Sequence, residues 1–308
     1  MFGLSGSVAA ALLSMYLFWG GTYLAAKFGL ESMPPLVLTS TRFLLAGILM
    51  YAVEWKRGLA PAGWREWGNA AVVGTLLLTC GNGMLVWGLQ YIPSNIGAII
   101  PGTCPVWIIL IYWLWKKDAK PNTVTIVGIV MGFVGVVLLA QSAATERSHN
   151  YFLGVCLAMA GVFFWALGSI YSKMSAQPKS PIQWVAMQML CGGAVLFALA
   201  LFSGQWGSFD VWAVTAKSLG GLLYLIICGS CLGYASYIWL LNNSTPALAS
   251  TFAYVNPLVA VFVGWFFADE VLGKKEAIAA IVIIIAIFLV TVGNNRDVSA
   301  NASKNKGG

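Results

Sequence analysis

Two matched stripes of side chains carry the groups in this sequence that could hold a small solute. Each stripe has an aromatic ring, a hydroxyl and a lysine spaced four residues apart, so that its members share one face of a helix. They are Trp19, Tyr23 and Lys27, and Trp165, Ser169 and Lys173. The ammonium group at the end of each stripe could bind a carboxylate. The alternative is that both lysines sit at helix ends and extend to a membrane interface.

A single arginine lies about six residues inside an apolar stretch, where a guanidinium is expensive and usually faces a cavity or a partner. This is Arg42, within residues 36–55. Backbone carbonyls or Glu31 could anchor it in a structural role, or it could bind substrate directly, and the sequence leaves both roles open. The equivalent position in the second half of the chain, Gln188, keeps hydrogen bonding without charge.

Further candidates for substrate contact surround two prolines. They could stack on an aromatic solute or hold an amine by cation–π attraction, and the alternative for each is packing between helices. The aromatic candidates are Trp87, Trp107, Tyr237, Trp239 and Tyr254. Asn256, beside the second proline, is a polar candidate.

The two prolines, Pro105 and Pro257, fall near the middle of apolar stretches. Proline has no N–H and clashes with the carbonyl four residues earlier, so the carbonyls of Pro101 and Ala253 should lose their helical partners. Matching breaks in the two halves favour hinges that line a cavity. A structural kink is the alternative.

Ten apolar stretches of membrane-spanning length must position these residues. The chain is 59% hydrophobic and 9% charged, and an apolar helix crosses the hydrocarbon core in about 20 residues. The sequence therefore predicts an all-α membrane protein with ten transmembrane helices. The expected spans are 7–29, 36–55, 69–91, 95–115, 122–142, 151–174, 182–203, 215–241, 247–267 and 276–293.

The first five spans return in the last five. An offset of 146 takes Trp19 to Trp165 and Gly47 to Gly193, and an offset of 152 takes Gly81 to Gly233 and Pro105 to Pro257. Since each unit has an odd number of spans, the second copy should enter the bilayer inverted, as in many secondary transporters. We expect a first five-helix repeat over 1–145, a second, inverted one over 146–293, and a polar cytoplasmic tail over 294–308 that is disordered.

Charge outside the spans predicts the orientation. With both termini in the cytoplasm, the cytoplasmic connections carry eleven Lys and Arg residues and the opposite face five, as the positive-inside rule requires. Glycine patterns such as Gly128 with Gly132 allow close helix approach, either within one molecule or in a homodimer. The sequence does not decide between these two uses.

Absences narrow the function. The connections are too short for a soluble catalytic or nucleic-acid-binding module, and no Asp or Glu falls clearly inside a span. We therefore expect no enzyme, no cofactor, no metal and no nucleic-acid partner. The partners should be the lipid bilayer and a neutral, zwitterionic or anionic small molecule, moved most simply by facilitated diffusion. A channel would need a polar pore-lining stripe, whereas a non-transporting receptor or assembly factor stays an alternative.

Two ordered sets of residues stand out, one in each half of the chain. The first is Trp19-Gly20-Gly21-Thr22-Tyr23 followed by Lys27, Pro34-Pro35 and Arg42-Phe43, and the second is Tyr254-Val255-Asn256-Pro257 followed by Glu270. With these motifs the chain resembles the EamA family of the drug/metabolite transporter superfamily. The resemblance implies a ten-helix inverted-repeat transporter in a bacterial inner membrane. Members often export amino acids or other amphipathic compounds. We therefore expect export of small amphipathic metabolites, amino acids including aromatic ones first, by alternating access, with another metabolite or drug as the alternative cargo.

Overall fold

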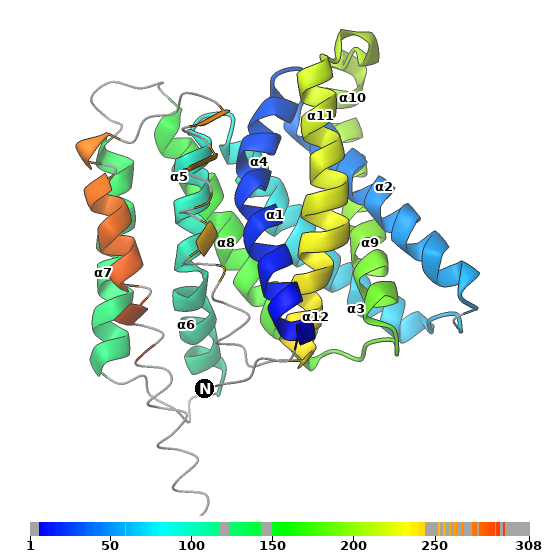
Figure 1. Cartoon of the computed structure of the whole chain (residues 1–308), viewed down its shortest axis with the longest axis horizontal. Coiled ribbons are helices and arrows are strands. Elements are labelled where there is room, and N and C mark those ends of the chain that lie inside the picture. The colour runs from blue at the N-terminus through cyan, green and yellow to red at the C-terminus, as the bar shows by residue number, and fades with distance from the viewer. Residues whose placement is uncertain are drawn as a thin grey trace, which may run out of the picture.

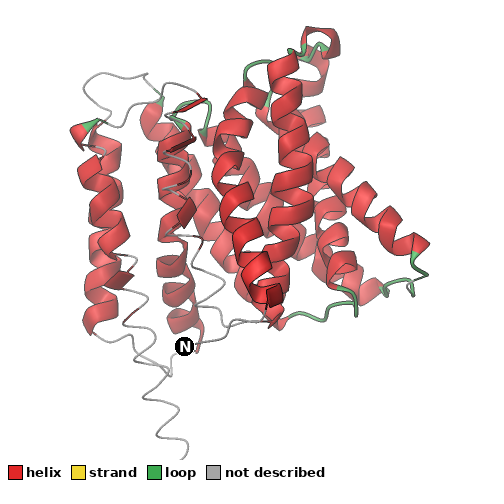
Figure 2. Ribbon diagram, in the orientation of Figure 1, coloured by secondary structure: helices red, strands yellow, loops and turns green. Residues whose placement is uncertain are grey.

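All regular secondary structure in the described part of the chain is helical (Figure 2). The computed structural model describes residues 6–58, 60–116, 123–142 and 150–243, and only separate residues and short stretches between 252 and 292. Within these residues, six helices are long and apolar enough to cross a membrane, and shorter apolar helices accompany them. The prediction of an all-α membrane protein is confirmed. The total of ten spans stays a prediction, because 247–267 falls mostly outside the described residues.

The first half of the chain forms five predicted spans, two of which contain non-α turns. The bounds are α1 Gly6–Leu30, α2 Pro35–Lys56, α3 Trp64–Gly74 continued by η1 Thr75–Gly83 and α4 Met84–Gly88, α5 Ser94–Ile99 continued by η2 Ile100–Thr103 and α6 Cys104–Lys116, and α7 Thr123–Ser142. The segment η1 is π-helical and η2 is a 3-10 helix. Both follow the helix before them without a break in the helical residues, so we describe each group as one rod.

The second half repeats this order as far as it is described. The bounds are α8 Tyr151–Met174, α9 Pro181–Phe202, the short α10 Gln205–Ser208 and η3 Val211–Ala213, and α11 Ala216–Tyr224 continued by η4 Leu225–Tyr234 and α12 Ala235–Asn243. The segment η4 is π-helical, like η1 in the equivalent rod. Proline opens both α2 and α9, at Pro35 and Pro181, where its missing N–H costs the helix nothing.

The helices α2 and α9 pack tightly and run in opposite directions. A Cβ at Gly47 would lie 3.0 Å from Leu190, and a Cβ at Gly193 would lie 3.0 Å from Leu44. As the residue number rises along α2 it falls along α9, so the helices are antiparallel. Small residues let the two backbones approach closely, as is usual between helices in membranes.

The first helix of each half packs against the rod that forms the third span of the other half. In Figure 1, α1 lies along the rod of α11 and α12, and Ser218 donates to the Phe28 carbonyl at 2.7 Å. In the same way α8 packs on the rod of α3, η1 and α4, where Tyr171 donates to Asn69 at 3.2 Å. Both π-helical segments therefore face the middle of a long helix from the opposite half.

The fourth span shows what replaces a missing helical hydrogen bond. We predicted that Pro105 would deprive the Pro101 carbonyl of its usual helical partner, and another backbone donor takes that place. The chain forms a 3-10 turn before Pro105, and the Cys104 N–H bonds the Pro101 carbonyl. A 3-10 turn bonds three residues back instead of four, so it satisfies a carbonyl that proline cannot reach. The matching Ala253 and Pro257 lie outside the described residues.

Candidate functional site

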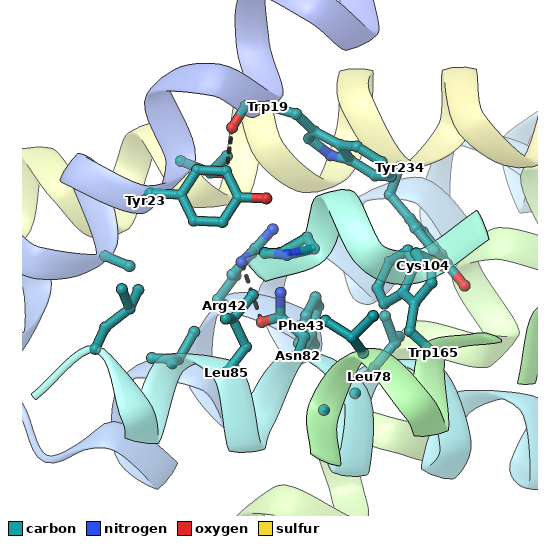
Figure 3. Close-up of a pocket in the computed structure, with 18 of the residues that line it drawn as sticks. Trp19, Tyr23, Arg42, Phe43, Leu78, Asn82, Leu85, Cys104, Trp165 and Tyr234 are labelled. Atoms are coloured by element: carbon teal, nitrogen blue, oxygen red, sulfur yellow. Dashed lines mark hydrogen bonds between the residues drawn. The ribbon is translucent and has the colours of Figure 1, made fainter. Parts of the chain in front are cut away.

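A cavity of about 780 Å³, its open mouth included, lies between the two halves. Residues of α1, α2, η1, α4, η2, α6, α8 and η4 line it, so both halves of the chain contribute. Its aromatic members are Trp19, Tyr23, Phe43, Trp165, Tyr234 and Phe252. Figure 3 shows most of these rings around one space, with the Arg42 guanidinium and the Tyr23 hydroxyl turned toward it.

Arg42 is the cation of this cavity. Arg42 is only 4% exposed, yet it lines the cavity. The Nε donates to Ser230 Oγ at 2.8 Å and Nη1 donates to Asn82 Oδ1 at 3.4 Å. Both partners lie on the π-helical segments, Asn82 on η1 and Ser230 on η4. The guanidinium is thus positioned by one neutral side chain from each half of the chain.

Gly229 makes room for this arginine. A Cβ at this position would lie 2.9 Å from Arg42 Nη2 and 2.9 Å from Thr22 Cγ2. Such a distance is too short for real atoms, so any larger residue would displace the guanidinium or the helix. The carbonyl of the same glycine accepts a hydrogen bond from Trp19 Nε1 at 2.9 Å. Gly229 of η4 therefore helps to position both the Arg42 guanidinium and the Trp19 ring.

Within the described part of the chain, no carboxylate neutralises Arg42. No Asp or Glu is among the described residues that line the cavity. Glu31, which we considered as an anchor, pairs with Lys217 at 2.5 Å instead. Glu54 is buried, but it bonds Ser180 at 2.5 Å and Arg57 at 3.1 Å at the far end of α2. The cavity consequently holds a positive charge with neutral neighbours.

The matched tryptophans Trp19 and Trp165 meet at the cavity. Their ring centroids are 5.8 Å apart and the rings are nearly perpendicular. Each packs against the equivalent glycine of the other half: a Cβ at Gly233 would collide with Trp19, and one at Gly81 would lie 3.3 Å from Trp165. Only their hydrogen bonding differs. Whereas Trp19 bonds a carbonyl, the buried Nε1 of Trp165 has no hydrogen-bond partner among the described residues.

Two predicted residues support the wall from behind. Ser169 donates to the Trp165 carbonyl at 2.8 Å and shares a 3.1 Å hydrogen bond with the Tyr237 hydroxyl. Tyr237 is buried and packs on Trp19 and Trp165 at 5.3 and 5.7 Å. Neither Ser169 nor Tyr237 lines the cavity. Their hydroxyls are used within the protein, so both act on a ligand only through the tryptophans.

Several predicted site residues lie away from the cavity. Lys27 is half-buried, Lys173 is exposed, Trp87 is 36% exposed, and Trp107 and Trp239 are half-buried. None of these five lines the cavity. For Lys173, exposure at the end of α8 agrees with the alternative in which the lysine extends to the interface. Trp107 packs on Phe163 at 5.3 Å, as expected of a residue between helices.

The second proline motif is only partly described. Asn256 is buried, and neither polar atom of its side chain has a hydrogen-bond partner in the described part of the chain. It does not line the cavity. Tyr254 and Pro257 lie outside the described residues. Pro105 lies within α6, close to Cys104, which lines the cavity.

Sequence reasoning missed three cavity partners: Asn82, Ser230 and Tyr234. Asn82 and Tyr234 line the cavity, and Ser230 holds Arg42. Tyr234 also donates to Gln188 Oε1, the residue equivalent to Arg42. The signal was present, because Asn82 and Ser230 are isolated polar residues in long apolar stretches, where a polar side chain needs a partner.

The arrangement suits non-covalent binding of an amphipathic molecule with a negative end. The rings and the aliphatic residues Leu78, Leu85 and Val86 offer apolar surface, while Arg42 and Asn82 offer polar groups at one place. An apolar pocket with a few convergent polar groups is the usual form of a small-molecule site. Both halves of the chain contribute to it.

Comparison with known proteins agrees with this arrangement. The model of the EamA-like transporter family matches residues 6–141 and again 152–292. The chain is 37% identical to the inner membrane transporter YedA of Escherichia coli, itself uncharacterized, over 92% of this chain and 90% of the relative. It is 27% identical to the uncharacterized transporter YvbV of Bacillus subtilis, over 92% and 90%.

A solved crystal structure shares the fold. It superposes with a TM-score of 0.66 over 94% of this chain and 98% of that chain, at 19% identity. The family match covers nearly the whole sequence, and it falls once on each predicted half. This protein therefore belongs to the EamA-like transporter family.

Proposed function

We propose that this protein exports small amphipathic metabolites, above all amino acids with apolar or aromatic side chains, by alternating access. The carrying observation is the aromatic cavity that Trp19 and Trp165 form between the two halves, with Arg42 inside it. Rings suit an apolar side chain, and a guanidinium suits a carboxylate. The outward direction follows the family resemblance.

Reciprocal packing supports an inverted repeat as the basis of the mechanism. The Gly47–Leu190 contact is repeated as Leu44–Gly193 across antiparallel helices. Equivalent helices that run in opposite directions imply halves related by an axis in the membrane plane. Rocking of one half against the other would expose the cavity to each side in turn. The ten-span count and the cytoplasmic location of both termini are part of this proposal.

The test is flux into proteoliposomes that contain the purified full-length protein. We expect uptake of apolar and aromatic amino acids from a panel, and loss of that uptake in Trp165→Ala. The matched control is Trp212→Ala, because Trp212 is 92% exposed and distant from the cavity wall. Flux of a nucleotide sugar or a quaternary ammonium ion, without flux of any amino acid, would show that the substrate proposal is wrong.

A further inference from the structure

The free edge of the Arg42 guanidinium is the first observation that defines the substrate. Arginine has five N–H donors, and Ser230 and Asn82 take two of them. Among the described residues three donors are left without an acceptor, one on Nη1 and both on Nη2. These atoms share the end of the planar group, which is the geometry that a carboxylate binds with two parallel hydrogen bonds.

The second observation is the charge of the site. Arg42 is buried, and the described residues around it are neutral. A buried charge without a counter-ion is costly, and an ion pair in such a place gains because the surroundings screen it weakly. A bound carboxylate would supply both the missing charge and the missing acceptors. A ligand without an anionic group would leave the cation uncompensated.

The third observation concerns the amino group that an amino acid would bring. An ammonium needs acceptors or a carboxylate, and no Asp or Glu is found among the described lining residues. An ammonium placed beside the guanidinium would meet a like charge. Apart from Arg42, the amine finds only neutral groups among the described lining residues, such as the Tyr23 hydroxyl and the aromatic rings. The cavity therefore has a charged partner for the acid but none for the amine.

From these three observations we infer that the site recognises its substrate through the carboxylate and does not require the amino group. This inference rests on the proposed function and narrows it. The substrate class is organic carboxylates with an aromatic or branched apolar end, and amino acids are its aminated members. Deaminated or N-acylated analogues belong to the same class, whereas amines and amides of the same size do not.

Binding to the purified full-length protein at pH 7.5 tests the inference with four ligands that share one ring. They are L-phenylalanine, 3-phenylpropanoate, L-phenylalaninamide and 2-phenylethylamine, each titrated by calorimetry. We expect 3-phenylpropanoate to bind at least as tightly as L-phenylalanine. The amide and the amine should bind about tenfold more weakly or worse, because they lose the charge-assisted hydrogen bonds to Arg42. Binding is measured instead of flux, since protonated phenylpropanoate crosses lipid unaided.

Two variants locate the effect. Arg42→Gln should abolish the preference for the acids over the amide, and the matched control Lys217→Gln should keep it, because Lys217 pairs with Glu31 at an exposed site. The four wild-type titrations decide the inference even where Arg42→Gln does not fold. Weak binding of 3-phenylpropanoate beside firm binding of L-phenylalanine would overturn the inference and leave the proposed function standing.

The same titrations also distinguish failure of the proposed function from failure of the inference. Firm binding of 3-phenylpropanoate without binding of L-phenylalanine would support the inference and refute the amino-acid half of the proposed function. Equal binding of the amide and the amino acid would overturn the inference, as would the absence of binding by all four ligands. In that last case the flux panel judges the proposed function independently.

Discussion

Gly193 of α9 faces Leu44 of α2 so closely that a Cβ on the glycine would lie 3.0 Å from both the Cγ and the backbone nitrogen of the leucine. The same contact recurs with the partners exchanged, as Gly47 against Leu190. Backbone atoms cannot move aside as a flexible side chain can. One added methyl group at this interface between the two halves should therefore destabilise the packing.

We expect Gly193→Ala and Gly47→Ala each to destabilise the protein by about 1–3 kcal/mol, the usual cost of overpacking. The measurement is thermal unfolding in detergent. Gly220→Ala is the control, because nothing lies within 4 Å of the Cβ position there. Unchanged melting temperatures for both interface variants would mean that α2 and α9 separate easily.

Gly229→Ala should weaken substrate binding without removing any charged group. The added methyl would occupy space that Arg42 Nη2 and Thr22 now fill, so the guanidinium should move away from the cavity. Affinity should fall by about one to two orders of magnitude, as the loss of 1.5–3 kcal/mol in charge-assisted bonds implies. Gly220→Ala again serves as the control. Wild-type affinity in Gly229→Ala would argue against direct contact between Arg42 and substrate.

Trp165→Phe tests the indole N–H that lacks a partner. The Trp165 Nε1 is closed off in the structure, so a substrate reaches it only when the wall shifts on binding. Phenylalanine keeps a ring in the wall but removes the donor, and substrate affinity should then fall by about 2- to 10-fold, the worth of one neutral hydrogen bond. The control is Trp206→Phe, because Trp206 also has a buried indole N–H without a partner among described residues, away from the cavity. Identical affinity in both variants would assign Trp165 to packing alone.

Pro105→Ala should slow transport more than it lowers expression. Alanine restores an N–H that can bond the Pro101 carbonyl, which the Cys104 N–H now occupies, and the 3-10 turn would tend to become α-helical. Turnover in proteoliposomes is the measurement. Pro181→Ala is matched to it, since Pro181 opens α9 and no N–H is needed there. Equal turnover in both variants would make Pro105 a packing residue.

Lys27 and Lys173 were first considered as sided contacts for a substrate carboxylate. Since neither lines the cavity, we expect Lys27→Ala and Lys173→Ala to change affinity by less than the factor of about ten that loss of a direct charged contact implies. Uptake measured separately from each face of the membrane checks this. A large loss confined to one face for either variant would restore that lysine to the site.

The sequence predicted the elements better than the contacts. Long apolar runs identified α1, α2, α8 and α9 to within one residue at each end, because hydrocarbon requires them. Arg42 was also found, since a charge within such a run is conspicuous. Its partners Asn82 and Ser230 were missed because both lie on π-helical segments. A π-helical turn contains an extra residue, which rotates the side chains after it away from the face that regular helical spacing predicts.

The lysines show a limit of reasoning from helical spacing. Spacing of four residues placed Lys27 on the face of Tyr23, but each further turn also carries a side chain about 6 Å along the helix axis. Two side chains on the same face of a helix therefore need not line the same cavity. Tyr23 and Ala26 line the cavity, whereas Lys27, the next residue along α1, does not.

Gly229 ties two features of the site to one backbone position, with an evolutionary consequence. Its carbonyl is bonded to Trp19 and its missing side chain admits Arg42. A mutation there cannot be neutral while residue 42 stays long and charged. Relatives that carry uncharged cargo are expected to have lost both together, so that residues 42 and 229 should vary as a pair across the family. Covariation of this kind would trace substrate charge through the lineage.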